Sequence, residues 1–233
     1  MIDALTALQL QIEWGADEAL AEAPLDRFER PVRREPAPPM PTSVPSPPAG
    51  SLDALYAALQ AFEGSALRAT AMHTVRPDGN PHAGLVVIGD APGSDDDRSG
   101  RAFSGPPGQV LDRVLGSIGL DRTHMLLTHL VPWRPPGNRP LSESEIQACL
   151  PFVHRLLALV RPKRLLLLGA APVRALTGST EPIRRLKGRL LQAVVADADL
   201  TVTAMALPPV EQWFRSATSK QELWSDLIQF RTW

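Results

Sequence analysis

Two loops rich in glycine contain the side chains with the clearest chemical potential. The string Gly89-Asp-Ala-Pro-Gly93 follows a short apolar run; its glycines permit close backbone approach, and Asp90 projects a carboxylate from the loop. An aspartate that only caps a strand-ending turn would have the same pattern. A second string, Gly100-Arg-Ala-Phe-Ser-Gly105, places Phe103 in polar surroundings, where an aromatic ring either covers the core or stacks on a flat ligand.

A third loop is basic and stiff. Trp133-Arg-Pro-Pro-Gly-Asn-Arg-Pro140 holds two arginines between prolines, which resembles a preset clamp for phosphate oxygens. Arginines on an ordinary solvated loop would have the same sequence. From Trp133 to Leu190 basic residues far outnumber acidic ones, although the whole chain has a net charge of −1. We therefore expect a local basic surface, whose side chains either contact phosphates or are simply solvated.

The residue types favour neither a metal nor a disulfide. In Asp95-Asp-Asp97 three adjacent carboxylates cannot all converge on one ion, so we predict a solvated turn and no metal site. Cys149 is the only cysteine, which excludes an intrachain disulfide, a zinc cage of cysteines and a four-thiolate iron–sulfur site. We predict no cofactor.

Length and composition exclude two further classes. The chain has 233 residues, enough for one large domain or a medium domain with an appendage. It is 44% hydrophobic, but no apolar run approaches the ~20 residues that a bilayer-spanning helix needs. The start contains Asp3 and lacks a basic region before an apolar stretch, so we predict no secretory signal. A cytoplasmic protein without a membrane partner is expected.

The chain is expected to have three parts. Helical spacing of Leu5, Leu8 and Ile12 predicts an N-terminal helical extension over residues 1–30. Residues 31–50 are rich in proline and predict a semi-rigid linker, either an ordinary tether or a docking motif for a protein partner. The compact domain is predicted over residues 51–233.

Within this domain, apolar runs alternate with helical patterns. The runs at 85–88, 125–131, 164–168 and 201–207 predict buried strands. Apolar spacing predicts helices at 52–62, 110–120, 171–176 and 219–230, and a further helix that opens at Ser142 with Glu145 in its capping box. This alternation predicts a three-layer α/β/α sandwich with a central, mostly parallel four-stranded sheet.

The predicted sheet indicates where a ligand would bind. Open parallel sheets bind ligands at the carboxyl ends of their strands, so the loops that follow the four strands should gather there. The first of these loops carries Asp90, and the second carries the two arginines. In the last helix, four apolar residues are expected to face inward: Leu223, Trp224, Leu227 and Ile228.

Taken in order, these strings resemble the type-4 uracil-DNA glycosylases. The resemblance extends over Ser51 to Phe230, and the segment Trp14-Gly-Ala-Asp-Glu-Ala19 resembles an N-terminal extension of some bacterial members. Besides the three loops, the matching strings are Ala148-Cys-Leu-Pro151, Pro162-Lys-Arg-Leu-Leu-Leu-Leu-Gly169, Arg185-Leu-Lys-Gly188 and Lys220 to Leu227.

The resemblance implies a domain that scans DNA, extrudes a deaminated base and hydrolyses its N-glycosidic bond. Asp90 stands where the family has a glutamate near the sugar and the attacking water, and Phe103 stands where a phenylalanine stacks on uracil. The other implied base-binding residues are Gly89, Ala91 and Gly93. The implied DNA-binding residues are Arg134, Asn138, Arg139 and Lys187.

Three departures from the family affect the expected catalysis. Asp90 is one methylene shorter than glutamate, which withdraws its carboxylate by roughly 1.5 Å. His129 replaces an asparagine that reads the uracil edge, and it either donates to the base or is a satisfied histidine behind the pocket. Pro209, or Leu207 if the register slips by one, replaces a histidine that donates to the leaving base. We therefore predict a protein that binds DNA and hydrolyses poorly or not at all.

Two alternatives stay open. One is an active glycosylase of altered base preference, in which the catalytic residues are Asp90 and His129. The other is a non-catalytic scaffold that recruits a protein through the N-terminal helix and the linker. Ser65 and Trp133 stand where the family often has cluster cysteines, and Cys149 alone matches a ligand position, so no iron–sulfur cluster is expected.

Overall fold

The computed structural model describes residues 49–232. The predicted helical extension and all but the last two residues of the predicted linker lie outside this range. Ala49, which falls within the predicted linker, is buried, and its carbonyl oxygen accepts a hydrogen bond of 2.8 Å from Nε of Arg155. The chain is therefore packed against the domain from the first described residue.

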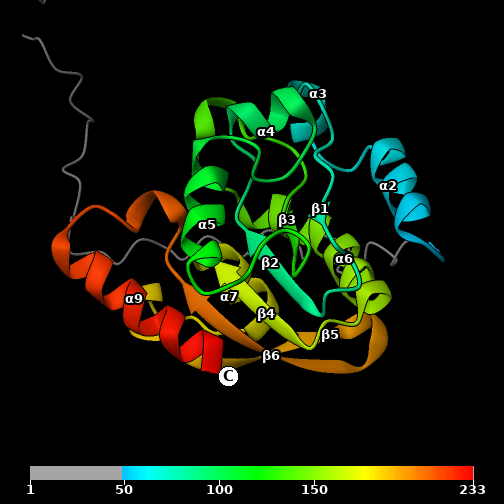
Figure 1. Ribbon diagram of the computed structural model, residues 1–233. Helices are drawn as coiled ribbons and strands as arrows, with labels where there is room; N and C mark the ends of the chain where they lie inside the picture. The colour runs from blue at the N-terminus through cyan, green and yellow to red at the C-terminus, as the bar shows by residue number, and fades with distance from the viewer. Residues whose placement is uncertain (1–48, 233) are drawn as a thin grey trace, which may run out of the picture. The chain divides into compact units, whose positions relative to one another are not determined.

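A six-stranded sheet forms the centre of the domain, with the strand order β1-β3-β2-β4-β6-β5 (Figure 1). Neighbouring strands from β3 to β6 in this order run parallel, whereas β1 and β5 pair antiparallel at the two edges. The strands are β1 Asp78–Gly79, β2 Leu85–Gly89, β3 Leu126–His129, β4 Arg164–Leu168, β5 Leu190–Val195 and β6 Leu200–Leu207.

The four predicted strands and the mostly parallel sheet are confirmed, but the predicted number of strands is wrong. The four predicted strands are largely buried, which is why they appear as continuous apolar runs. The two missed strands are edge strands. β1 has only two residues, Asp and Gly, and β5 has Gln192 within it and is partly exposed, so neither produces a strong apolar signal.

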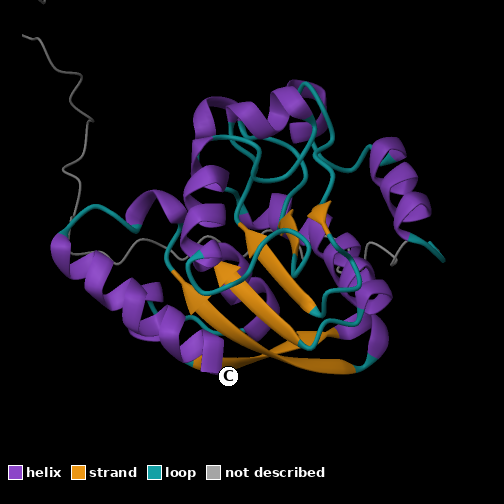
Figure 2. Ribbon diagram, viewed as in Figure 1, coloured by secondary structure: helices purple, strands orange, loops and turns teal. Residues whose placement is uncertain are grey.

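Helices cover both faces of the sheet (Figure 2). The α-helices are α2 Leu52–Ala61, α3 Leu67–Thr70, α4 Ser94–Ser99, α5 Pro106–Gly116, α6 Glu143–Val160, α7 Ala170–Thr177, α8 Ile183–Leu186 and α9 Ala217–Thr232. The short 3₁₀ turns are η1 Pro136–Asn138, η2 Ala196–Ala198 and η3 Val210–Gln212. The predicted capping box of α6 is confirmed, because Ser142 Oγ accepts from the Glu145 N–H at 3.3 Å and the Glu145 carboxylate accepts from the Ser142 N–H at 2.8 Å.

Alternate residues of β2 belong to two separate cores. Val86 and Ile88 pack in one buried cluster with side chains of α2, α6 and α7, and Leu85 and Val87 pack in another with α5 and α9. This alternation follows from the two-residue period of a strand, whose successive side chains point to opposite faces. It confirms the three-layer α/β/α sandwich.

Two details of the predicted helices are wrong. The helix expected over 110–120 is α5, which begins earlier because Pro106 suits the first turn of a helix. In α9, Leu223 and Leu227 face inward as expected, whereas Trp224 and Ile228 are each 49% exposed. A helix turns by about 100° per residue, so residues next to the inward stripe point toward its flank. None of the described helices is long and apolar enough to cross a membrane.

Candidate functional site

A cavity of about 790 Å³ opens at the carboxyl ends of the central strands. Its walls come from the ends of all four parallel strands: Gly89 at the end of β2 and Asp90 after it, His129 at the end of β3, Ala171 after β4, and Pro209 after β6. The predicted gathering of these loops is therefore confirmed. The predicted residues Gly89, Asp90, Ala91, Gly93, Phe103, His129, Asn138 and Arg139 all line this strand-end cavity.

Asp90 is held by the start of α7. The Ala171 N–H donates to its Oδ1 at 3.2 Å, so the positive end of a short helix faces the carboxylate. A Cβ on Gly169 would lie 2.3 Å from Oδ2, and Gly169 has a φ of 113°, so this position suits glycine alone. Burial raises the pKa of Asp90 to about 6, although the Ala171 hydrogen bond and the neighbouring His129 act in the opposite direction. At neutral pH the carboxylate is mostly ionised.

Phe103 is tightly fixed beside the cavity. Its backbone lies in the left-handed region with a φ of 53°, and its carbonyl oxygen accepts a 2.7 Å hydrogen bond from Arg122. Arg122 is in turn paired with Asp112 at 2.9 Å. The phenyl ring stacks on His129, with ring centroids 4.5 Å apart and planes inclined by 22°, and Phe103 is only 6% exposed. One face of the ring is thus covered by an imidazole.

Asp96 lines the cavity although the sequence did not predict a functional role for it. Its Oδ2 lies 3.2 Å from Nε2 of His129 and accepts from the Gly93 N–H at 3.1 Å, while its Oδ1 accepts from the Ser104 N–H at 2.6 Å. Burial alone would raise the pKa of Asp96, but the hydrogen bonds from His129 and the two backbone donors outweigh it and hold that pKa well below its ordinary range. Asp96 therefore joins three loops of the site as an ionised acceptor.

The prediction of a solvated turn for residues 95–97 is wrong in consequence. Asp96 and Asp97 are 7% and 4% exposed, because both carboxylates accept backbone hydrogen bonds. Asp97 binds the N–H groups of Met72 and His73 at 2.8 and 3.1 Å. The spacing in the sequence could have indicated this role, since an acidic side chain three residues after Gly93 can accept a hydrogen bond from the Gly93 N–H at the start of α4. No group of three metal-ligating side chains occurs among residues 49–232.

The loop from Trp133 to Pro140 borders the cavity, and its two arginines already donate hydrogen bonds within the protein. Nε of Arg134 donates to Asn138 at 2.7 Å, and Arg139 donates to the Glu145 carboxylate at 2.9 Å. The hydrogen bond from Arg139 lowers the pKa of Glu145 to about 2, so this pair stays charged. Arg174 of α7, which was not predicted, also lines the cavity.

Two predicted positions contribute differently. Lys187 lies apart from the described residues that line the cavity, and its ammonium group is paired with Glu222. Pro209 does line the cavity, with Val210 and Glu211 beside it, but a proline has no proton to donate. His129 is the one histidine among the described lining residues.

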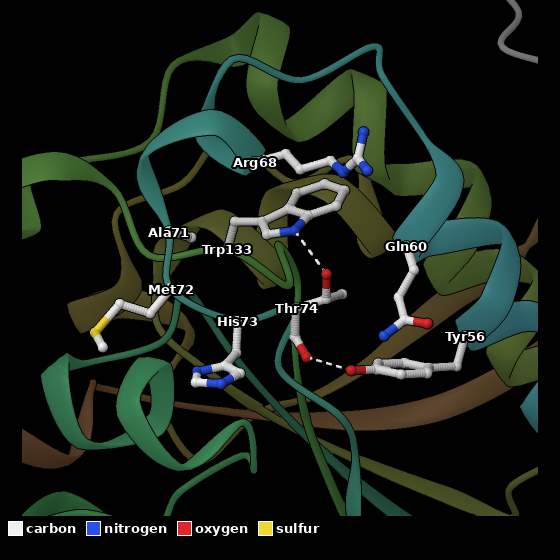
Figure 3. Close-up of a pocket in the computed structure, with 8 residues that line it drawn as sticks. All are labelled: Tyr56, Gln60, Arg68, Ala71, Met72, His73, Thr74 and Trp133. Atoms are coloured by element: carbon white, nitrogen blue, oxygen red, sulfur yellow. Dashed lines mark hydrogen bonds between the residues drawn. The ribbon is translucent and has the colours of Figure 1, made fainter.

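A smaller cavity of about 290 Å³ lies near Trp133 and is called the Trp133 pocket here. Figure 3 shows the indole of Trp133 beneath Arg68, with its N–H donating to Thr74 at 3.1 Å. The hydroxyl of Tyr56 donates to the Thr74 carbonyl at 2.7 Å (Figure 3). Its eight lining residues are Tyr56, Gln60, Arg68, Ala71, Met72, His73, Thr74 and Trp133.

The neighbourhood of the Trp133 pocket does not suit an iron–sulfur cluster. Trp133 and Cys149 pack in one apolar cluster with Leu67, and burial raises the pKa of the Cys149 thiol to about 12. Cluster iron is held by several cysteine thiolates, whereas this chain has a single cysteine. Ser65, which precedes Leu67 of this cluster in the chain, is also buried, and its hydroxyl has no hydrogen-bond partner in the described part of the chain. Around Cys149 the cluster consists of an indole and aliphatic side chains, none of which can bind iron.

Comparison with known proteins agrees with this geometry. The profile of the Uracil DNA glycosylase superfamily matches residues 76–228. A type-4 uracil-DNA glycosylase of Pyrobaculum aerophilum is 29% identical over 162 residues, which cover 68% of this chain and 82% of the relative. That of Saccharolobus solfataricus is 40% identical over 98 residues, 42% of this chain and 45% of the relative. That of Archaeoglobus fulgidus is 34% identical over 119 residues, 51% and 60%.

The matched region includes the whole sheet, the strand-end cavity and most of α9. It takes in the Asp90 loop, Phe103 and His129 but leaves out α2 and most of the wall of the Trp133 pocket. By the extent of this match and by its three-layer fold, the chain belongs to the uracil-DNA glycosylase superfamily, and the curated relatives named above are type-4 enzymes.

Proposed function

We propose that this protein binds DNA and accommodates an extruded, deaminated base in the strand-end cavity, with hydrolysis of the N-glycosidic bond weakened or lost. The observation that carries the proposal is the cavity itself, which Asp90, Phe103 and His129 share at the carboxyl ends of the parallel strands. A cavity of about 790 Å³ has room for a nucleobase together with its sugar.

The chemistry of the walls supports a weak reaction. Cleavage of the glycosidic bond develops positive charge on the sugar and negative charge on the leaving base. The ionised Asp90 carboxylate is suited to the sugar side, where it would stabilise the cation and orient water. The base side needs a hydrogen-bond donor, and Pro209 supplies none. Loss of one such donor typically slows a reaction by about 10² to 10³.

DNA contact is assigned to the rim of the cavity. Arg134 is not itself among the described lining residues, but its Nε donates at 2.7 Å to Asn138, which lines the cavity. Arg174 also lines the cavity and pairs with Glu143 at 3.6 Å. Arg139, Arg174 and Lys187 contribute less to phosphate binding, because each already has a carboxylate partner. This distribution predicts that Arg134→Ala weakens binding more than Lys187→Ala does.

A salt titration tests the DNA-binding part. Fluorescence anisotropy with a labelled duplex that contains one uracil should show affinity falling steeply with salt, and Arg134→Ala should lower the salt slope by about 1. Arg231→Ala, an exposed arginine at the end of α9, is the matched control and should leave the slope unchanged. A flat salt response with feeble affinity would refute DNA binding and favour the scaffold alternative.

A cleavage assay tests the catalytic part. Excess protein is incubated with duplexes carrying uracil, hypoxanthine or xanthine, followed by alkali, and we expect slow strand scission or none. The second candidate is an active glycosylase of altered base preference, favoured by the ionised Asp90 and the imidazole of His129 on neighbouring walls. Rapid scission of any of these duplexes that disappears in Asp90→Asn would establish that candidate instead.

A further inference from the structure

The rings of His129 and Phe103 stack on each other, and both residues line the strand-end cavity. Their planes are nearly parallel, with centroids 4.5 Å apart, and both side chains are almost fully buried. Flat ligands stack on aromatic rings with the same spacing and inclination. The imidazole therefore takes up a position against Phe103 that a stacked base would need.

Asp96 fixes the imidazole in this position. Because the Asp96 carboxylate is ionised and can only accept, the Nε2 atom of His129 must carry the proton that is shared with Oδ2 at 3.2 Å. Asp96 itself cannot follow a moving ring, since its oxygens are anchored by the N–H groups of Ser104 and Gly93. The hydrogen bond thus ties His129 to a rigid point.

The other side of the imidazole is held by contact alone. Nδ1 of His129 is buried and has no hydrogen-bond partner within residues 49–232. A Cβ on Gly89 would lie 2.9 Å from this nitrogen and 2.7 Å from Cζ of Phe103, so both rings already touch the backbone of β2. The ring therefore cannot move further toward β2, whereas another side of His129 lines the cavity.

We propose that His129 covers the face of Phe103 on which an extruded base stacks, and that Asp96 holds it there as a latch. This inference rests on the proposed function, and it assigns His129 a specificity-determining role and Asp96 a positioning role. A base stacks on Phe103 only after the hydrogen bond between His129 and Asp96 breaks and the imidazole swings out. A base that cannot displace the His129 ring does not bind in the cavity.

Competition between free imidazole and free uracil tests the latch without DNA. His129→Ala leaves an imidazole-sized space against Phe103, so both compounds should raise its melting temperature, and each should weaken the binding of the other. Uracil should bind this variant at least tenfold more tightly than it binds the wild type. His154→Ala is the matched control, because the Nδ1 atom of His154 is also buried without a partner within the described range, yet His154 lies on α6 apart from the cavity.

The role of Asp96 has its own readout. Nitrogen chemical shifts of His129 should report the Nε2–H tautomer in the wild type and a mixture of tautomers in Asp96→Asn, in which uracil affinity should rise.

If His129→Ala does not fold, His129→Asn removes the ring and keeps a polar side chain, and the same competition is measured. Uracil that binds His129→Ala no better than wild type, or that binds together with imidazole, would overturn the latch. DNA binding by the wild type is measured separately, so failure of the proposed function and failure of the latch are distinguishable.

Discussion

The strand-end cavity and the Trp133 pocket show opposite treatments of buried polar groups. The cavity keeps two largely buried aspartates and a histidine that line or adjoin one space. In the apolar cluster that includes Trp133 of this pocket, an indole, a protonated thiol and aliphatic side chains pack together. Burying charge is unfavourable unless it is paired, whereas burying apolar surface is favourable. The buried charges of the first region therefore cost free energy that packing does not explain, whereas packing explains the second region.

Within the cavity, the two aspartates also differ. Asp96 accepts enough hydrogen bonds to lower its pKa, so its charge stabilises the fold. Asp90 has a raised pKa, because burial destabilises its ionised form. A destabilised carboxylate in a cleft indicates a functional group, and a satisfied one indicates a structural support. Four substitutions test the comparison of the two regions and that of the two aspartates, from the largest expected effect to the smallest.

Trp133→Ala should have the largest effect, a loss of about 3–5 kcal/mol in the free energy of unfolding. Trp133 is 1% exposed and stacks near Phe62, so its removal leaves a cavity in the apolar cluster. Urea denaturation measures the loss. Trp224→Ala is the control, because Trp224 is 49% exposed and its removal should change stability by less than about 0.5 kcal/mol. A small effect of Trp133→Ala would mean that packing does not hold this region.

Asp96→Ala should destabilise the protein by about 3 kcal/mol at neutral pH, since it leaves buried donors of Gly93, Ser104 and His129 without their acceptor. Because the folded-state pKa is lowered, the stabilisation by Asp96 is complete above its ordinary pKa and is lost as the pH falls below it. Asp95→Ala, the neighbouring aspartate with an exposed Arg98 partner, should have little effect. Equal losses in both variants would contradict the role given to Asp96.

Asp90→Asn should stabilise the protein above pH 6, by an amount on the order of 2 kcal/mol. The pKa of Asp90 is raised from 3.8 to about 6 in the folded state, so the folded state holds this proton more tightly than the unfolded state. Wild-type stability due to Asp90 therefore falls as the pH rises from about 4 to about 6. Unfolding of both proteins from pH 4 to pH 8 should show a gap that closes at the acidic end. A gap independent of pH would show that charge is not its cause.

Ser65→Ala should have the smallest effect, a gain of about 1 kcal/mol, because it removes a buried hydroxyl that lacks a partner among the described residues. A rise in melting temperature measures it. Ser117→Ala, at an exposed serine that donates to the Val114 carbonyl, should give no gain. Destabilisation by Ser65→Ala would show that the hydroxyl is hydrogen-bonded. The apolar region around Trp133 would then also hold a satisfied buried polar group.

The central strands and the cavity position were predictable for one physical reason. Strands buried on both faces must be apolar throughout, and parallel strands bring their carboxyl ends to one edge. The sheet pattern therefore predicts that Asp90 and His129 lie near one another, whereas only the family resemblance predicts that Phe103 joins them. The edge strands, the outward position of Trp224 and the early start of α5 were not predictable, because partial burial and helix starts at proline give weak patterns.

The sequence by itself determined the α/β fold, the family and the residue types available at the cavity, since local apolar patterns and motif order are properties of the chain. Only the tertiary structure decided which carboxylate is satisfied and which is strained. It also decided that His129 lies flat on Phe103 and is tied to Asp96. Burial and hydrogen bonding depend on distances between segments far apart in the chain, and a carboxylate that looks solvated in the sequence can become a buried anchor when three loops converge on it.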